Sequence, residues 1–102
     1  MAFSNINNTY WHPTPVVGQS SVVSSSVVTL FAVAPNVKSN FAIVNVALAD
    51  VMVTFGGDTP SATVGHLWKA GTDHPLSMGA ALSAKFIQAS SSSTLYTSEW
   101  ML

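Results

Sequence analysis

Charged residues are scarce in this chain. Asp, Glu, Lys and Arg make up 7% of its 102 residues, against roughly 25% in an average soluble domain, and arginine does not occur. A free monomer with so few charges has weak electrostatic protection against self-association. Scarce charge with retained aromatics is typical of the buried centre of a protein–protein interface. The composition predicts an assembling protein; a small soluble β domain with a hydroxyl-rich surface is the alternative.

Other absences exclude further classes. No cationic segment is present to neutralise phosphates, so we expect no nucleic-acid partner. The lack of cysteine excludes disulfides and thiolate metal sites, but leaves the compartment open. The longest apolar stretch, near residues 27–34, is far shorter than the ~18 residues of a membrane helix, so we expect no membrane partner. Residues 1–15 have neither the cationic start nor the apolar run of a signal peptide.

Residues 1–15 differ from the rest of the chain. Pro13 and Pro15 fix their own backbone angles and push His12 and Thr14 towards extended conformations. The segment nevertheless carries large apolar side chains, among them Phe3, Ile6, Tyr10 and Trp11. We therefore predict an extended N-terminal arm, residues 1–15, that lies on another surface, either its own domain or a neighbouring subunit.

Residues 16–102 read as short strands. The segments are rich in Val, Thr, Ile and aromatics, and turn residues cut them at spacings of about 8–12 residues. This pattern predicts one all-β domain, a β-sandwich or jelly-roll-like barrel of about seven short antiparallel strands. The segment NFAIVNVAL is apolar on both faces, as expected for a central strand covered on both sides. Gly56 and Gly57 predict a tight turn.

Two further segments are assigned to strands. ATVGHLW would align Val64, His66 and Trp68 on one face, and LSAKFIQA would point Leu82, Ala84 and Phe86 inward. Residues 78–85, MGAALSAK, have the propensity for one helical turn, but Gly79 and the flanking strands argue against it. TLYTSEW is the last strand.

The stretch GTDHPLSMG brings an acid, a base and a hydroxyl together as Asp73, His74 and Ser77. A catalytic triad needs these groups to converge on one point. Adjacent residues of an extended backbone point to opposite faces, and no nucleophile elbow or oxyanion-hole signature surrounds Ser77. We expect a connecting loop in which Asp73 bonds its own backbone, and no catalytic residue.

Metal and glycosidase sites are also disfavoured. His66 and His74 have no metal-ligand spacing with Asp58 or Asp73, so we expect no metal and no cofactor. His66 is interpreted as a packed or interface histidine. Asp50 and Asp58 flank a hairpin and are expected to serve it rather than a sugar cleft.

The aromatic residues could stack on sugars or pack in interfaces. Sugar sites also need convergent polar partners, whereas these aromatics are scattered along the sequence, so packing is the preferred interpretation. Terminal residues normally fray, so we expect residues 100–102 to be held by a subunit contact. The predicted interface residues are Phe3, Tyr10, Trp11, Trp68, Tyr96, Trp100, Met101 and Leu102.

Over about residues 40–100, the order of the expected strands and the residues of their turns match the pattern of a known family. Its parts are Asn45, Phe55-Gly56-Gly57-Asp58, Pro75-Leu76 with Gly79, Phe86-Ile87-Gln88-Ala89 and Thr94-Leu95-Tyr96. In this order the chain resembles small β-sandwich structural proteins of tailed-bacteriophage virions. The arm at residues 1–15 lies outside the resemblance.

The resemblance implies a non-enzymatic virion component, made in the host cytoplasm. Our preferred expectation is a capsid decoration (cement) protein, a homo-oligomer such as a trimer, bound to the major capsid protein or another virion protein. A neck, tail or head-fibre component is the alternative within this class. A carbohydrate-binding adhesion module is the alternative from another class.

Overall fold

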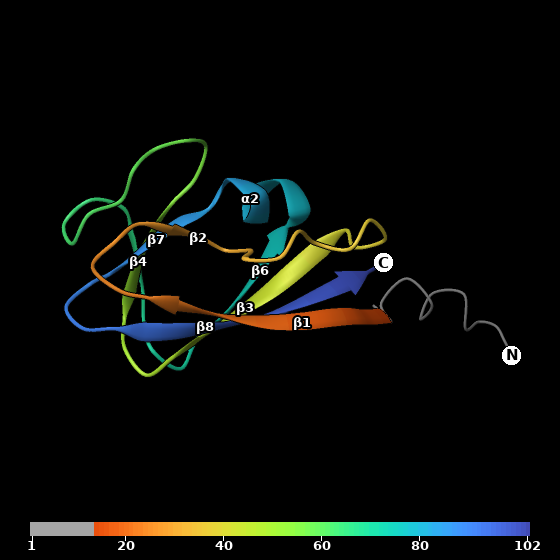
Figure 1. The fold of residues 1–102 in the computed structure, drawn as a ribbon, viewed down its shortest axis with the longest axis horizontal. Coiled ribbons are helices and arrows are strands. Elements are labelled where there is room, and N and C mark those ends of the chain that lie inside the picture. The colour runs from red at the N-terminus through yellow and green to blue at the C-terminus, as the bar shows by residue number, and fades with distance from the viewer. Residues whose placement is uncertain (1–13) are drawn as a thin grey trace, which may run out of the picture.

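Eight strands and one short helix form the part of the chain that the structure, a computed structural model, describes, residues 14–102 (Figure 1). In chain order they are β1 (Thr14–Val23), β2 (Val28–Thr29), β3 (Phe41–Ala47), β4 (Val51–Thr54), β5 (His66–Trp68), β6 (Asp73–Ser77), α2 (Met78–Ser83), β7 (Lys85–Gln88) and β8 (Ser93–Met101). The predicted all-β class is confirmed, with eight strands in place of about seven.

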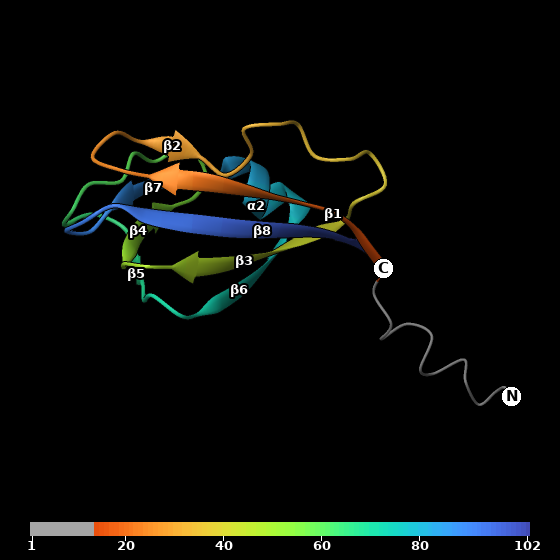
Figure 2. The same ribbon diagram turned by 60° about the horizontal axis from the view of Figure 1, so that its bottom comes forward.

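The strands form two four-stranded antiparallel sheets, in the orders β1-β8-β3-β6 and β2-β7-β4-β5. In these orders the first strand pairs with the eighth, the second with the seventh, the third with the sixth and the fourth with the fifth. Such nested pairing is that of one long hairpin rolled into two layers, the jelly-roll form of a sandwich. Figure 2 shows the first sheet with its four strands side by side.

The core lies between the two sheets. It is filled by every second side chain of each strand, because successive side chains point to opposite faces of a sheet. Along β3, Ala42, Val44 and Val46 are buried, while the residues between them are only half-buried. Val51 and Val53 of β4 and the ring of Phe86 meet them from the second sheet. The apolar inner faces of the two sheets therefore make one continuous cluster.

Strand β3 is central, as predicted, since it lies between β8 and β6. Its second face, however, is not buried: Phe41, Ile43 and Asn45 stay half-buried on the outer side of the sheet. The expectation of cover on both sides is therefore wrong for the described residues, because the second sheet covers only one side.

The stretch GTDHPLSMG is not a loop. Asp73–Ser77 forms β6, paired with β3 in a register that sets Ile43 opposite Pro75. Proline is tolerated here because β6 is an edge strand, and no strand within residues 14–102 pairs with its other side. Of the three residues that suggested a connection, Gly71 lies in the turn before β6, Pro75 lies in the edge strand itself and Gly79 lies in the helix that follows.

Helix α2 directly follows β6, although the sequence analysis favoured a strand over a helix for these residues. Ser77 caps α2, its hydroxyl oxygen accepting a hydrogen bond from the Ala80 N–H at 3.2 Å. The helical period turns Ala81 into the core and leaves Leu82 57% exposed, and Ala84, the extended residue that follows the helix, is also buried. The prediction that Leu82 points inward as a strand residue is therefore wrong, whereas Ala84 and Phe86 are buried as expected.

The valine-rich segment after β1 forms little sheet. Only Val28–Thr29 pairs as β2, and residues 30–40 cross the molecule as a loop. The carboxylate of Glu99, 1% exposed, ties this loop to β8: it accepts hydrogen bonds from the Asn36 N–H at 2.7 Å and the Ser39 hydroxyl at 2.9 Å. Both donors bond Oε1 of Glu99, so this buried polar atom has hydrogen-bond partners and its burial is less costly.

The β4–β5 hairpin turns where the sequence predicts it. Gly56 and Gly57 take positive φ angles of 69° and 95°. The returning strand is shorter than expected, since β5 contains only His66–Trp68 and Val64 makes an isolated bridge to Ser61. Asp50 closes the open end of this hairpin, which confirms the role predicted for it.

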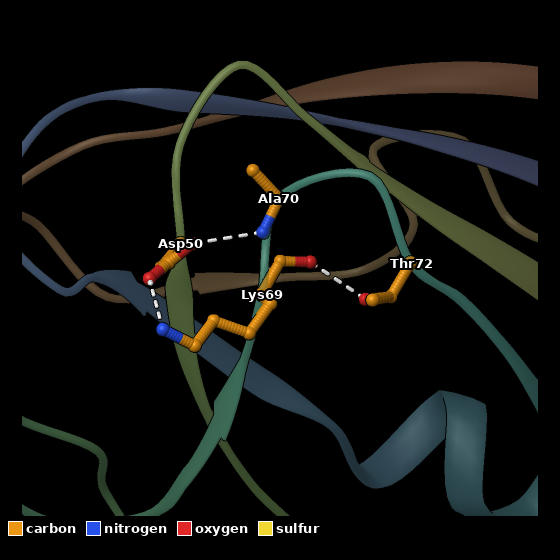
Figure 3. Close-up of polar contacts among 4 residues, drawn as sticks. All are labelled: Asp50, Lys69, Ala70 and Thr72. Atoms are coloured by element: carbon orange, nitrogen blue, oxygen red, sulfur yellow. Dashed lines mark hydrogen bonds and ion pairs between the residues drawn. The ribbon is translucent and has the colours of Figure 1, made fainter.

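Figure 3 shows the contacts of Asp50 at this end. Its carboxylate accepts a hydrogen bond from the Ala70 N–H at 2.8 Å and pairs with the ammonium of Lys69 at 3.7 Å. The Thr72 hydroxyl donates to the Lys69 carbonyl at 2.6 Å. These bonds shape the corner at which the chain passes from β5 in one sheet to β6 in the other.

Strand β1 begins at Thr14, so Thr14 and Pro15, assigned to the arm from the sequence, belong to the sheet. Thr14 lies opposite Met101 and Pro15 opposite Trp100. The remaining predictions for the arm, including the contacts of Phe3, Tyr10 and Trp11, lie outside the described residues.

Candidate functional site

The acid, base and hydroxyl of residues 73–77 do not converge. Asp73 points to the outer side of β6, where its carboxylate accepts a hydrogen bond from the Asn45 amide at 2.8 Å. His74 points to the other side, and Ser77 caps α2. The opposed directions are as predicted from adjacency, but Asp73 bonds a neighbouring strand rather than its own turn.

His74 packs instead against Trp68, with ring centroids 3.8 Å apart and planes inclined by 4°. The Thr72 hydroxyl proton goes to the Lys69 carbonyl, so the imidazole donates its Nε2–H to Thr72 Oγ1 at 2.7 Å. Burial lowers the pKa of His74 below 6.5, and the nearby Asp73 carboxylate opposes this shift in part. This pair joins the edge strands β5 and β6 across the two sheets.

We call the side of the β1-β8-β3-β6 sheet (Figure 2) that is turned away from the second sheet the outer face. It carries the exposed Tyr96 and the half-buried Trp100 and Phe41. The strand registers place its residues in rows across the sheet. One row is Pro15, Trp100, Phe41 and Ser77; the next is Gly18, Ser98, Ile43 and Pro75; a third is Ser20, Tyr96, Asn45 and Asp73. Within these rows, the charged residue is Asp73.

Side-chain contacts organise the aromatic end of this face. The rings of Trp100 and Phe41 stack at 6.4 Å with their planes at 18°, and the Trp100 Nε1–H donates to the Ser98 hydroxyl at 2.7 Å. Tyr96, four residues before Trp100 on the same side of β8, is 55% exposed. At about 3.4 Å per residue the two aromatics stand roughly 14 Å apart.

A shallow hollow of about 460 Å³ lies between these aromatics. Its lining includes Gly18, Ile43, Asn45, Tyr96, Ser98 and Trp100. Gly18 keeps it open, because the residue opposite Ser98 on β1 has no side chain. The hollow therefore combines two aromatic walls, a small-residue floor and, on one side, the Asn45–Asp73 polar pair.

The predicted interface residues of the described chain fall into three places. Tyr96 and Trp100 share the outer face. Trp68 lies apart, packed against Phe86 at 5.6 Å and against His74, so its described contacts are within its own chain. The chain end lies beside the start of β1: Met101 pairs with Thr14, and the Leu102 N–H donates to the Asn40 side chain.

Two expectations change with these positions. Trp100 and Met101 belong to β8, so no subunit contact is needed to hold them; whether one exists stays a prediction. His66 is exposed, with its ring 6.3 Å from that of Phe55, so it is not packed between Val64 and Trp68, and the alternative of an interface histidine stays a prediction.

Sequence reasoning missed Phe41 and Ile43 as members of this face. The signal was present, since NFAIVNVAL is apolar at alternate positions on both sides. It was interpreted as double burial, and only the register with β8 shows that Phe41 meets Trp100. The convergence of Asn45 and Asp73 beside Tyr96 likewise depends on two strand pairings far apart in sequence.

Fold and surface together define an eight-stranded β-sandwich with one aromatic, weakly charged sheet face. Comparisons of the chain with family models, with curated proteins and with solved structures each found no match. Within residues 14–102, no group of three or more His, Asp or Glu side chains is placed to hold a metal ion. The same residues form no helix of the length and apolarity needed to cross a membrane.

Proposed function

We propose that this protein is a non-enzymatic structural component of a bacteriophage particle, and specifically a capsid decoration protein that acts as a homo-oligomer. The observation that carries this proposal is the outer face, where Tyr96, Trp100, Phe41 and Ile43 form an apolar surface with one charged neighbour, Asp73. Depletion of charge around exposed aromatics is what the centre of an interface requires.

Two further observations support the virion assignment. The motifs from Asn45 to Tyr96 resemble those of tailed-phage virion proteins, and the jelly-roll order is one that viral capsid domains use. The second argument is a fold analogy, because the same architecture also serves lectins.

The mechanism of such a protein is burial. Each contact removes apolar surface from water at roughly 25 cal/mol per Å². Repetition over many equivalent sites of a lattice then turns contacts of modest strength into stability of the whole particle.

Quantitative mass spectrometry of purified phage particles that encode this chain tests the proposal. We expect the chain in the particles at a copy number comparable with that of the major capsid protein. A handful of copies per particle would favour the neck, tail or fibre alternative. Particles without the chain would contradict the virion assignment.

A carbohydrate-binding module is the second candidate, and the hollow favours it. Tyr96 and Trp100 offer ring faces, and Asn45, Asp73 and Ser98 supply the polar partners that the linear sequence did not bring together. A glycan array tests this candidate: specific binding that Tyr96→Ala abolishes would support it, and an array without any bound sugar would contradict it.

A further inference from the structure

The outer face has the character of a covered surface, yet residues 14–102 leave it open. Phe41 and Ile43 project from the central strand β3 on this side, and Trp100 and Tyr96 project from β8 beside them. A sheet face exposed to water normally alternates to polar residues. Aromatic and aliphatic side chains at these positions indicate that another polypeptide covers them.

The chain itself supplies a segment of suitable chemistry next to this face. Residues 1–13 precede Thr14 and therefore join the sheet at the row that holds Pro15, Trp100 and Phe41. They include the apolar side chains Phe3, Ile6, Tyr10 and Trp11, and no Asp, Glu, Lys or Arg. An uncharged aromatic segment complements an apolar face on which Asp73 is the charged residue.

We propose that the outer face binds residues 1–13 of a second copy of this chain, with Tyr10 or Trp11 in the hollow between Tyr96 and Trp100. This inference rests on the proposed homo-oligomer and names the surface that forms it. The proposal places the binding surface of the arm on β8 and β3, whereas the sequence alone did not identify this surface.

The dimensions allow this contact. Thirteen extended residues span up to about 43 Å, whereas four strands about 4.8 Å apart make a sheet less than 20 Å across. Each aromatic side chain of the arm brings roughly 150–250 Å² of surface to bury, and the hollow of about 460 Å³ lies within the size range of sites that accept such groups.

The prolines favour a second copy over the chain's own face. Thr14 and Pro15 are held in β1, and Pro13 and Pro15 restrict the backbone around Thr14 to extended conformations. A segment that folded back over its own sheet would have to reverse direction at this point. An arm that continued in the extended direction of Thr14 and Pro15 would instead pass the end of its own sheet and could reach another molecule.

Complementation between two full-length variants tests the proposal. The face variant is Tyr96→Asp, matched by the control Leu67→Asp, because Tyr96 and Leu67 are 55% and 50% exposed and Leu67 belongs to the other sheet. The arm variant is the double substitution Tyr10→Asp with Trp11→Asp. Its control, Asn7→Asp with Asn8→Asp, adds the same charge and keeps the aromatics.

Sedimentation equilibrium should show wild type and both controls self-associating. The face and arm variants alone should associate at least about tenfold more weakly, as expected for loss of a central aromatic contact. An equal mixture of the two should recover a 1:1 complex, because the mixture contains one intact arm and one intact face.

Three outcomes would overturn the proposal: a face variant that associates as tightly as Leu67→Asp, a mixture that recovers no complex, or a wild-type chain that stays monomeric throughout. None of them depends on the copy number in particles. The arm assignment and the virion assignment can therefore fail independently.

Cysteine cross-linking gives a second readout, since the chain has no cysteine of its own. Chains carrying Thr9→Cys, which keeps both Tyr10 and Trp11, are mixed with chains carrying Ser20→Cys in the Tyr96 row of the outer face. The two should form a disulfide-linked pair under mild oxidation. Thr63→Cys, in the exposed loop after β4, is the matched control. Equal cross-linking to both positions would also overturn the proposal.

Discussion

Gly65 occupies a backbone position that other residues tolerate poorly. Its φ angle is 130°, and an added Cβ would lie 2.8 Å from the Val53 carbonyl oxygen. We expect Gly65→Ala to lower the free energy of unfolding by about 1–3 kcal/mol, measured by urea denaturation. The control is Gly79→Ala, where nothing lies within 4 Å of the added carbon and helix propensity predicts no loss. Equal stability of the two variants would contradict this account.

His74 should make stability depend on pH. Its pKa in the folded protein is lowered from 6.5, because burial next to Trp68 disfavours the charged ring. The unfolded chain therefore binds a proton more readily, so the contribution of His74 is fully present above pH 6.5 and is lost as the pH falls through the folded pKa.

Urea denaturation of wild type and His74→Gln at about pH 7.5 and about pH 5 measures this dependence. Wild type should lose more stability than the variant on acidification. An NMR titration that places the pKa of His74 above 6.5 would contradict the prediction.

At the scale of elements, the corner between β5 and β6 depends on a hydrogen bond more than on an ion pair. The Lys69 and Asp50 side chains are 70% and 33% exposed, and exposed pairs contribute little. We expect Lys69→Ala to change the free energy of unfolding by less than about 0.5 kcal/mol, and Asp50→Ala to lower it by about 1 kcal/mol, because the Ala70 N–H loses its acceptor. Urea denaturation distinguishes them, and a larger loss for Lys69→Ala would reverse the assignment.

The elements also show what the sequence could reveal. The all-β class, the central place of β3, the last strand β8 and the Gly56-Gly57 turn follow from residue type and alternation. Strand β6 and helix α2 do not, because Pro75 is tolerated only at a sheet edge, and a six-residue helix is too short for a periodic pattern. Whether a strand lies at a sheet edge, or a short helix forms, depends on neighbouring elements in the folded structure, which the local sequence does not identify.

The candidate site was less predictable than the fold for the same reason. Tyr96 and Trp100 could be placed on one side of one strand from their spacing alone. Their meeting with Phe41, and with the Asn45–Asp73 pair, depends on the register between β8, β3 and β6. Alternation gives the side of a strand on which a residue lies, but not its partner across the sheet.

Across the whole molecule, the scarcity of charged residues and the strand order together determine which side chains the outer face presents. Among residues 14–102, the ion pair of Asp50 and Lys69 lies at one corner, and the buried carboxyl group of Glu99 accepts hydrogen bonds from its own chain. In the rows of the outer face, Asp73 is the charged residue, and the other side chains are apolar or uncharged polar groups. A surface of this kind has little electrostatic repulsion to oppose contact between copies.

The pairing of β1 with β8 also sets the order in which the protein can be made. Ribosomes release the chain from its N-terminal end, so β1 and β3 leave the tunnel long before the strand that lies between them exists. The inner hairpin of β4 and β5 is available early, whereas the first sheet closes only when Ser93–Met101 has emerged. A premature stop codon within β8 would therefore remove the strand that joins β1 to β3, and with it the sheet that carries the aromatic face.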